Sequence, residues 1–439
     1  MRSCRRPWVA GLGAALLIAA LGTAEERQVS APGIFDATLI EKGRYLAIVG
    51  DCISCHTRPH RAPFAGGLTL STPFGVIYSA NITPDAVSGI GRWSEQQFAR
   101  AMREGIAADG THLYPAFPYT EFTKVSDEDL HALYAYLRSL RAVRYTPPKN
   151  HMSFPFGIRA LLIGWNMMFL KAERYVPDPA RSTEWNRGAY LTQGLGHCGA
   201  CHTPRNVLGG ERQTEALTGG TYRDEILDEV LDDRTTPMDE WTVRAWSAAN
   251  LTPAPSGLGA WSLEDIAAYL KSGHNPRAGA FGPMSTVIVN STSHLTDADV
   301  HAIAVYLRSL APARQGVPAK PDPEQRRAGE VAYTTRCGDC HQATGLGMPR
   351  TSNADPSKTA PPLAGNAALQ APDPATLINV ILYGAHEAVI SRGSWPKMSG
   401  FELSVGLDDD QIAALCTYVR SSWGNEASAV DAATVSRQH

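Results

Sequence analysis

Apolar side chains recur at helical spacing in three long segments, over residues 125–140, 295–310 and 407–423. In the first of these, Leu133, Tyr136, Leu137 and Leu140 fall on one face of a helix. Each segment opens on a residue that caps helix N-termini and is followed by acids that favour a first helical turn: Ser126, Thr296 and Asp408. A shorter helical pattern lies upstream of each, over residues 41–46, 186–191 and 327–333. The pattern therefore predicts three repeats of a short and a long helix.

A five-residue motif, Cys-x-x-Cys-His, follows each of the short helices. It is the attachment signature of c-type haem, because two thiols add across the haem vinyl groups and the adjacent imidazole reaches the iron. The motifs use six of the eight cysteines. We predict three covalently bound haem c groups, attached to Cys52, Cys55, Cys198, Cys201, Cys337 and Cys340, with His56, His202 and His341 as iron ligands.

Together the repeats and motifs predict an all-α fold of three tandem cytochrome c domains. The chain has 439 residues, of which 44% are hydrophobic, and this is enough for two or three domains. Strand patterns are sparse, and clusters of proline mark the linkers. The predicted domains are residues 36–146, 181–312 and 323–425, with a connecting segment at 147–180 and a disordered Ala- and Ser-rich tail at 426–439.

The second axial ligand of each iron should come from a loop before the long helix. A methionine thioether opposite histidine raises the reduction potential and suits electron transfer. Met284 stands 11 residues before Leu295, and Met398 stands 9 residues before Leu407. We predict that these two methionines bind the second and third irons.

The first domain departs from this pattern, because Phe117 occupies the equivalent loop. A phenyl ring cannot bind iron. Met102 falls inside a predicted helix, where core packing is expected, and His112 lies in the loop as either a ligand or a solvated side chain. The first haem is therefore expected to be five-coordinate, weakly ligated or lower in potential.

The N-terminus has the pattern of a secretory signal peptide over residues 1–24, with three arginines, a short apolar run and a small-residue cleavage site. Its removal changes the formal charge from −3 to about −6, which opposes nucleic-acid binding. Export fits the haem motifs. Of the two remaining cysteines, Cys4 lies in the signal peptide and Cys416 in a helical pattern, where burial is expected.

Two further features leave alternatives open. The repeated loops, Asn81 to Pro84 with Gly89 to Ser94 and Asn250 to Pro253 with Gly257 to Ser262, fit either hydrogen bonds to haem propionates or ordinary turns with one core tryptophan. Residues 154–170 are apolar nearly all round but are too short and Pro- and Gly-interrupted for a good membrane span. They fit either an interfacial docking helix or a buried interdomain helix.

With its motifs and loops together, the chain resembles the triple-haem cytochrome c subunit of periplasmic membrane-bound dehydrogenases. The segments that carry the likeness span residues 74–84, 109–116, 194–206, 361–366 and 421–425. The resemblance implies a separate catalytic subunit containing PQQ, FAD or molybdenum, which oxidises an alcohol, sugar or aldehyde. It also implies electron transfer through three haems to ubiquinone, at the periplasmic side of the cytoplasmic membrane and in contact with the membrane surface. The family's iron ligands fall on His56, His202, Met284, His341 and Met398, while the methionine expected at Phe117 is absent.

Two other functions compete with an electron-transfer subunit that has no catalytic residues of its own. One is a haem enzyme such as a peroxidase, using an open first haem, which the lack of a distal catalytic pair opposes. The other is a cytochrome subunit of a different respiratory complex, which the dehydrogenase-like loops oppose. No pattern in the chain resembles a zinc site, a nucleophile triad or a phosphate-binding loop.

Overall fold

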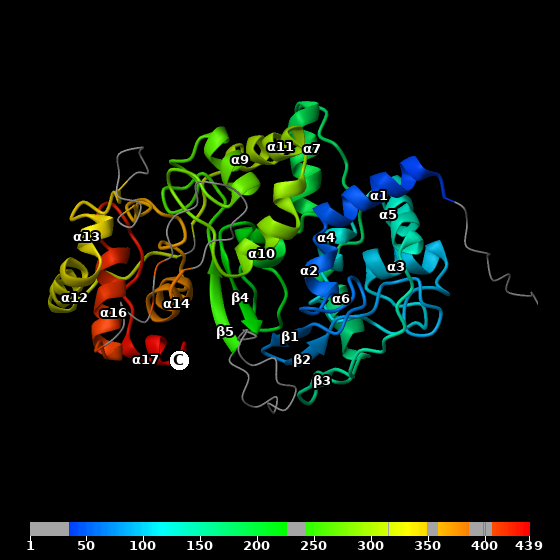
Figure 1. Cartoon of the computed structure of the whole chain (residues 1–439), viewed down its shortest axis with the longest axis horizontal. Helices are drawn as coiled ribbons and strands as arrows, with labels where there is room; N and C mark the ends of the chain where they lie inside the picture. The colour runs from blue at the N-terminus through cyan, green and yellow to red at the C-terminus, as the bar shows by residue number, and fades with distance from the viewer. Residues whose placement is uncertain are drawn as a thin grey trace, which may run out of the picture. The chain divides into compact units, whose positions relative to one another are not determined.

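The computed structural model describes residues 35–225, 243–314, 316–348, 359–385, 398, 400 and 406–439 (Figure 1). The predicted signal peptide lies outside these residues. Three pairs of helices organise the described chain, and they occupy the segments that the apolar pattern predicts. The pairs are α1 (Ala37–Val49) with α5 (Asp127–Ser139), α7 (Thr183–Gln193) with α11 (Asp297–Arg308), and α12 (Pro323–Arg336) with α16 (Asp409–Arg420). We call residues 36–146, 181–312 and 323–439 the first, second and third units.

Each pair crosses at a glycine of its first helix. A Cβ atom on Gly43 would lie 1.9 Å from the Ala132 carbonyl oxygen, and one on Gly188 would lie 1.9 Å from that of Ala302. On Gly329 it would lie 2.0 Å from the carbonyl oxygen of Ala414. Real Cβ atoms do not approach that closely, so the contact of the two backbones requires glycine. The three units therefore share one helix crossing.

A middle helix packs against the closing helix in every unit. These helices are α3 (Glu95–Glu104), α9 (Leu263–Ser272) and α14 (Ala375–Tyr383). The first two begin with a capping box, in which Ser94 and Ser262 accept a backbone hydrogen bond from the third residue of the helix. Shorter helical elements include α4 (Tyr119–Phe122), α6 (Leu161–Phe169), α10 (Pro283–Asn290), η1 (Gln213–Glu215) and η3 (Thr292–His294).

Two small antiparallel sheets correct the expectation of an all-α fold. The first has the order β1 (Thr69–Thr72), β2 (Gly75–Tyr78) and β3 (His151–Met152), with Leu70 opposite Ile77 and Gly75 opposite Met152. The second pairs β4 (Gly220–Glu225) with β5 (Val243–Ala248). The strands are short, and the pairing of β2 with β3 joins segments about 75 residues apart, so local patterns did not reveal the sheets.

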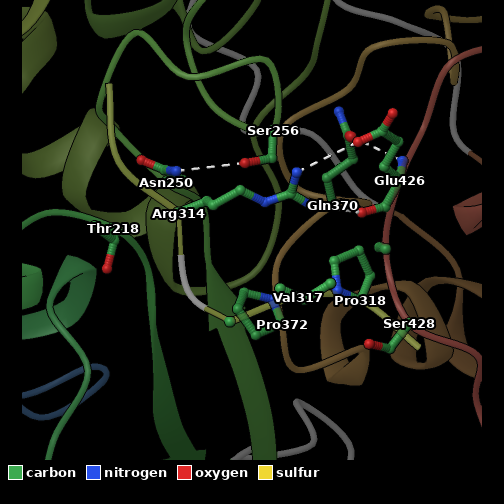
Figure 2. A pocket seen from close by; sticks show the side chains of 12 residues that line it. Thr218, Asn250, Ser256, Arg314, Val317, Pro318, Gln370, Pro372, Glu426 and Ser428 are labelled. Atoms are coloured by element: carbon green, nitrogen blue, oxygen red, sulfur yellow. Dashed lines mark hydrogen bonds and ion pairs between the residues drawn. The ribbon is translucent and has the colours of Figure 1, made fainter. Parts of the chain in front are cut away.

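The expectation of a disordered tail at residues 426–439 is wrong. Helix α17 (Ala432–Ser436) lies in this segment and packs against α16, with Val430 and Val435 buried. Figure 2 shows Arg314 and Glu426 beside a cavity, where the guanidinium lies 3.3 Å from the carboxylate. Disorder was predicted from an average composition of small and polar residues. The segment is ordered because two valines are buried and polar side chains make specific contacts.

The apolar segment 154–170 forms α6 and the loop before it. Leu162 and Trp165 are buried against a small cluster that contains Ile77, Tyr114 and Tyr119. Most of the other large apolar side chains are exposed, so the helix is only half covered. None of the described helices is both long and apolar enough to cross a membrane. Elsewhere Met102 and Cys416 are buried in cores, as predicted.

Candidate functional site

The three Cys-x-x-Cys-His motifs have the same local structure. Short helices α2 (Cys52–His56), α8 (Gly199–His202) and α13 (Gly338–His341) each lie shortly after the first helix of their unit. In every motif the histidine Nδ1 lies within hydrogen-bond distance of a backbone carbonyl oxygen. The partners are Ala80 for His56 (2.6 Å), Ala249 for His202 (2.7 Å) and Pro361 for His341 (3.1 Å).

These contacts prepare each imidazole to bind iron. A carbonyl oxygen only accepts hydrogen bonds, so Nδ1 carries the proton and Nε2 keeps its lone pair. Burial lowers the pKa of His56, His202 and His341. All three rings are therefore neutral and held in the tautomer that a metal ligand needs.

Four of the six motif cysteines have thiols with a raised pKa. Burial raises the pKa of Cys52, Cys198 and Cys337 to about 12, and that of Cys201 to about 11. Among the described residues, no group of three or more His, Cys, Asp and Glu side chains is placed to hold a metal ion. The described part of the chain therefore groups these thiols with too few further ligands for a zinc or iron–sulfur site.

A cavity in the third unit brings four predicted site residues together. Cys337, Cys340, His341 and Met398 all line it. Met398 is fixed by two backbone hydrogen bonds with Ala385, of 3.0 and 3.2 Å. The remaining wall is mainly apolar and includes Leu363, Leu369, Leu377, Val380, Ile381, Leu415 and Val419.

These residues fit a c-type haem. The cavity offers two thiols for the vinyl groups, an imidazole with a free Nε2, a thioether and apolar walls for the macrocycle. In the second unit the indole nitrogen of Trp261 is buried and has no partner among the described residues. Such a donor suits a cofactor carboxylate, so the second unit also offers a contact that the protein itself leaves unused.

Met284 is the second residue of α10 in the second unit. The preceding Gly282 has a φ of 58°, and a Cβ atom there would lie 2.8 Å from the Trp246 ring, so the backbone approaches the indole closely. Its position at a helix start, after this fixed turn, suits a ligand loop. Ligation of the second iron by Met284 stays a prediction.

The backbone places Phe117 at the position that corresponds to Met284. Helices α3 and α9 both end at a left-handed glycine, Gly105 and Gly273. The carbonyl of Gly105 accepts a 2.7 Å hydrogen bond from the Leu113 amide, as that of Gly273 does from the Ala280 amide. Phe117 and Met284 each stand four residues after that amide. The structure therefore aligns Phe117 with Met284, as the sequence comparison of the two loops predicts.

The repeated Asn loops are turns whose polar groups are used within the protein. Asn81 Oδ1 accepts hydrogen bonds from the Thr83 amide (3.0 Å) and hydroxyl (2.7 Å), and its Nδ2 donates to the carbonyl of Val143 (2.8 Å). Asn250 repeats this arrangement with Thr252 and Ala313. For the two asparagines the geometry favours the turn, because both amides are buried and already paired, whereas the Trp261 indole of the second loop is unpaired among the described residues.

Comparison with known proteins decides the family. The cytochrome c family model matches residues 40–141 and 327–423. The chain is 38% identical over 410 residues to the cytochrome c subunit of a quinone alcohol dehydrogenase of Gluconacetobacter polyoxogenes, covering 89% of this chain and 82% of that one. It is 36% identical over 456 residues to a fructose dehydrogenase cytochrome subunit of Gluconobacter japonicus, covering 96% and 86%. The chain belongs to the cytochrome c subunits of dehydrogenase complexes.

A longer relative matches the same region. This cytochrome subunit is 40% identical over 432 residues to one subunit of the nicotinate dehydrogenase of Pseudomonas putida, but spans only 34% of that protein. The family model covers the first and third motifs and leaves out the second. His202 nevertheless has the same imidazole-to-carbonyl contact as the two motif histidines that the model covers.

A buried carboxyl pair lies beside the second motif of the cytochrome subunit, and sequence reasoning missed it. Glu121 on α4 is 4% exposed, and its Oε2 accepts a 2.7 Å hydrogen bond from Thr120. A Cβ atom on Gly199 would lie 3.6 Å from oxygens of both Glu121 and Glu211. Burial, and then the neighbouring Glu211, raise the pKa of Glu121 to about 8. The two carboxyls stand 90 residues apart in sequence, so only the tertiary fold brings them together.

Proposed function

We propose that this cytochrome subunit passes electrons through three c-type haems, from a catalytic dehydrogenase subunit to ubiquinone. The observation that carries the proposal is the motif histidine, which in all three units has a carbonyl-bound Nδ1 and a free Nε2. Bound haem would supply a one-electron iron couple. The chain would attach it through the six motif cysteines and bind the iron through the three histidines, Met284 and Met398. We further propose that the three units are tandem cytochrome c domains, as the shared glycine crossing supports.

The second unit contacts both of the other units close to their motifs. The Asn290 amide of the second unit donates a 2.9 Å hydrogen bond to Ser54 in the first motif. The His197 ring, next to the second motif, lies 5.6 Å from that of Phe122 in the first unit. Gly279 and Phe281, which precede Met284, line the cavity of the third motif. These contacts favour a relay in which the second haem exchanges electrons with both of its neighbours.

We place the protein at the periplasmic side of the cytoplasmic membrane, exported by the N-terminal signal. Support for membrane contact comes from the α6 segment, where Phe154 is 89% exposed and Met167 83%. Phe156, Ile158, Leu161, Ile163 and Met168 are also exposed there. Seven exposed large apolar side chains within fifteen residues form the kind of surface that inserts between lipid headgroups.

Replacing Met167 with glutamate should weaken binding of the holoprotein to phospholipid vesicles by about tenfold, because one buried apolar side chain contributes about 1.5 kcal/mol or more. Co-sedimentation with vesicles measures this. Val317→Glu is the matched control, since Val317 is 94% exposed but lies outside the α6 segment. Equal loss of binding in both variants would contradict a docking role for α6.

Purification of the native complex tests the proposed function. We expect a large dehydrogenase subunit that contains PQQ, FAD or molybdenum to co-elute with this chain. Its alcohol, sugar or aldehyde substrate should then reduce all the haems, and added ubiquinone should reoxidise them. Co-elution with an oxidase, or saturable turnover of peroxide by the isolated chain, would overturn the proposal.

A further inference from the structure

The aromatic side chain of Phe117 is held firmly in the loop where the other units carry methionine. Its ring lies 5.3 Å from that of Phe122 and 6.5 Å from that of Tyr119. It packs against the core of the first unit and also against the small cluster beneath α6. A phenyl ring has no lone pair to give to a metal, so this residue fills the ligand loop without supplying a ligand.

Met102, the first alternative donor, is occupied elsewhere. It is 6% exposed and lies in the hydrophobic core on α3. Because Ser94 and Ser262 cap α3 and α9 in the same way, Met102 corresponds to Leu270. Leucine at that position packs against the core of the second unit. Met102 therefore packs as an ordinary core side chain, and its thioether does not serve as the iron ligand.

His112, the second alternative donor, is partly buried, and its Nδ1 has no hydrogen-bond partner among the described residues. It forms a β-bridge with Ile106, as Gly279 does with His274 in the second unit, so His112 corresponds to Gly279. Gly279 lines the cavity of the third motif, which belongs to the neighbouring unit. The matching face of the first unit lies under the α6 segment, since Arg159 donates a 2.5 Å hydrogen bond to the His112 carbonyl.

We propose that the haem bound by Cys52, Cys55 and His56 has an open sixth position, which takes a small neutral ligand such as carbon monoxide or nitric oxide when the iron is reduced. The inference rests on the proposed haem attachment at the first motif. Binding of carbon monoxide forms one coordinate bond to ferrous iron and changes no oxidation state. The second and third haems, with Met284 and Met398 as ligands, have no such position.

Carbon monoxide is the probe that tests this. The haem content and the mass of the peptide that contains Cys52 and Cys55 are measured first on the purified holoprotein, and three attached haems are expected. After dithionite reduction, the carbon monoxide difference spectrum should show one ligand bound per three haems. Phe117→Met should abolish this binding and add a third thioether-to-iron charge-transfer band to the oxidised spectrum.

Two controls make the result specific. Phe98→Met makes the same exchange at a buried core position, 5% exposed, and should leave carbon monoxide binding unchanged. Met102→Leu should also leave it unchanged. The inference is overturned if the wild-type protein has three attached haems and binds no carbon monoxide. It is also overturned if carbon monoxide binds to the Met102→Leu protein and not to the wild type, because Met102 would then be the sixth ligand. A first-motif peptide without haem would instead contradict the proposed function.

Discussion

Replacing Gly329 with valine should prevent the third unit from folding stably. A Cβ atom there would lie 2.0 Å from the Ala414 carbonyl oxygen and 2.8 Å from the Tyr418 Cβ. Neither of these atoms belongs to a flexible side-chain end, so α12 and α16 would have to separate. We expect a loss of about 3 kcal/mol or more in the free energy of unfolding of this unit. Guanidinium chloride unfolding, followed by circular dichroism, measures it.

Haem content gives a second reading of the same change. Cys337 directly follows α12, so a displaced α12 would also move the third motif. Peptide mass should show less haem on Cys337 and Cys340 and an unchanged amount on the first two motifs. Gly338→Ala is the matched control, because the nearest atom to its Cβ is 3.7 Å away. A Gly329→Val protein as stable as the Gly338→Ala protein would disprove the importance of the crossing.

The helices and their ends could be predicted because their signals are local. Ser126, Thr296 and Asp408 all accept the predicted capping hydrogen bond from a backbone amide three residues on. Apolar spacing then fixes the buried face of each helix. The sequence pattern also grouped Met398 with Cys337, Cys340 and His341, and all four residues line one cavity.

The features that were missed depend on contacts between distant segments. Strand β3 pairs with β2 across some 75 residues, and no alternating pattern in either strand is long enough to predict this. The C-terminal segment was predicted from its average composition, but Thr417 fixes it by accepting a 2.9 Å hydrogen bond from the Val430 amide. Composition describes an average, whereas order here depends on a few buried positions.

The buried carboxyl pair gives the second large expected effect, on stability against pH. In the folded protein the pKa of Glu121 is about 8, against an ordinary value of 4.5, because the side chain is buried and faces Glu211. Between these values the folded chain keeps a proton that the unfolded chain releases. Stability should therefore fall as the pH rises from about 5 to 8 and change little from this source above pH 8. Glu211 also contacts Arg205 at 3.4 Å.

Glu121→Gln should remove most of this pH dependence, because a buried amide needs no proton. One pKa unit corresponds to about 1.4 kcal/mol, so the wild type should lose on the order of 3 kcal/mol relative to the variant between pH 5 and pH 8. Denaturant midpoints of both proteins at the two pH values measure the difference. Glu104→Gln makes the same exchange at an exposed site of the first unit and should leave the wild-type slope intact. If stability changed equally with pH in the wild type and in Glu121→Gln, Glu121 would be ionised in the folded protein and the carboxyl pair would share no proton.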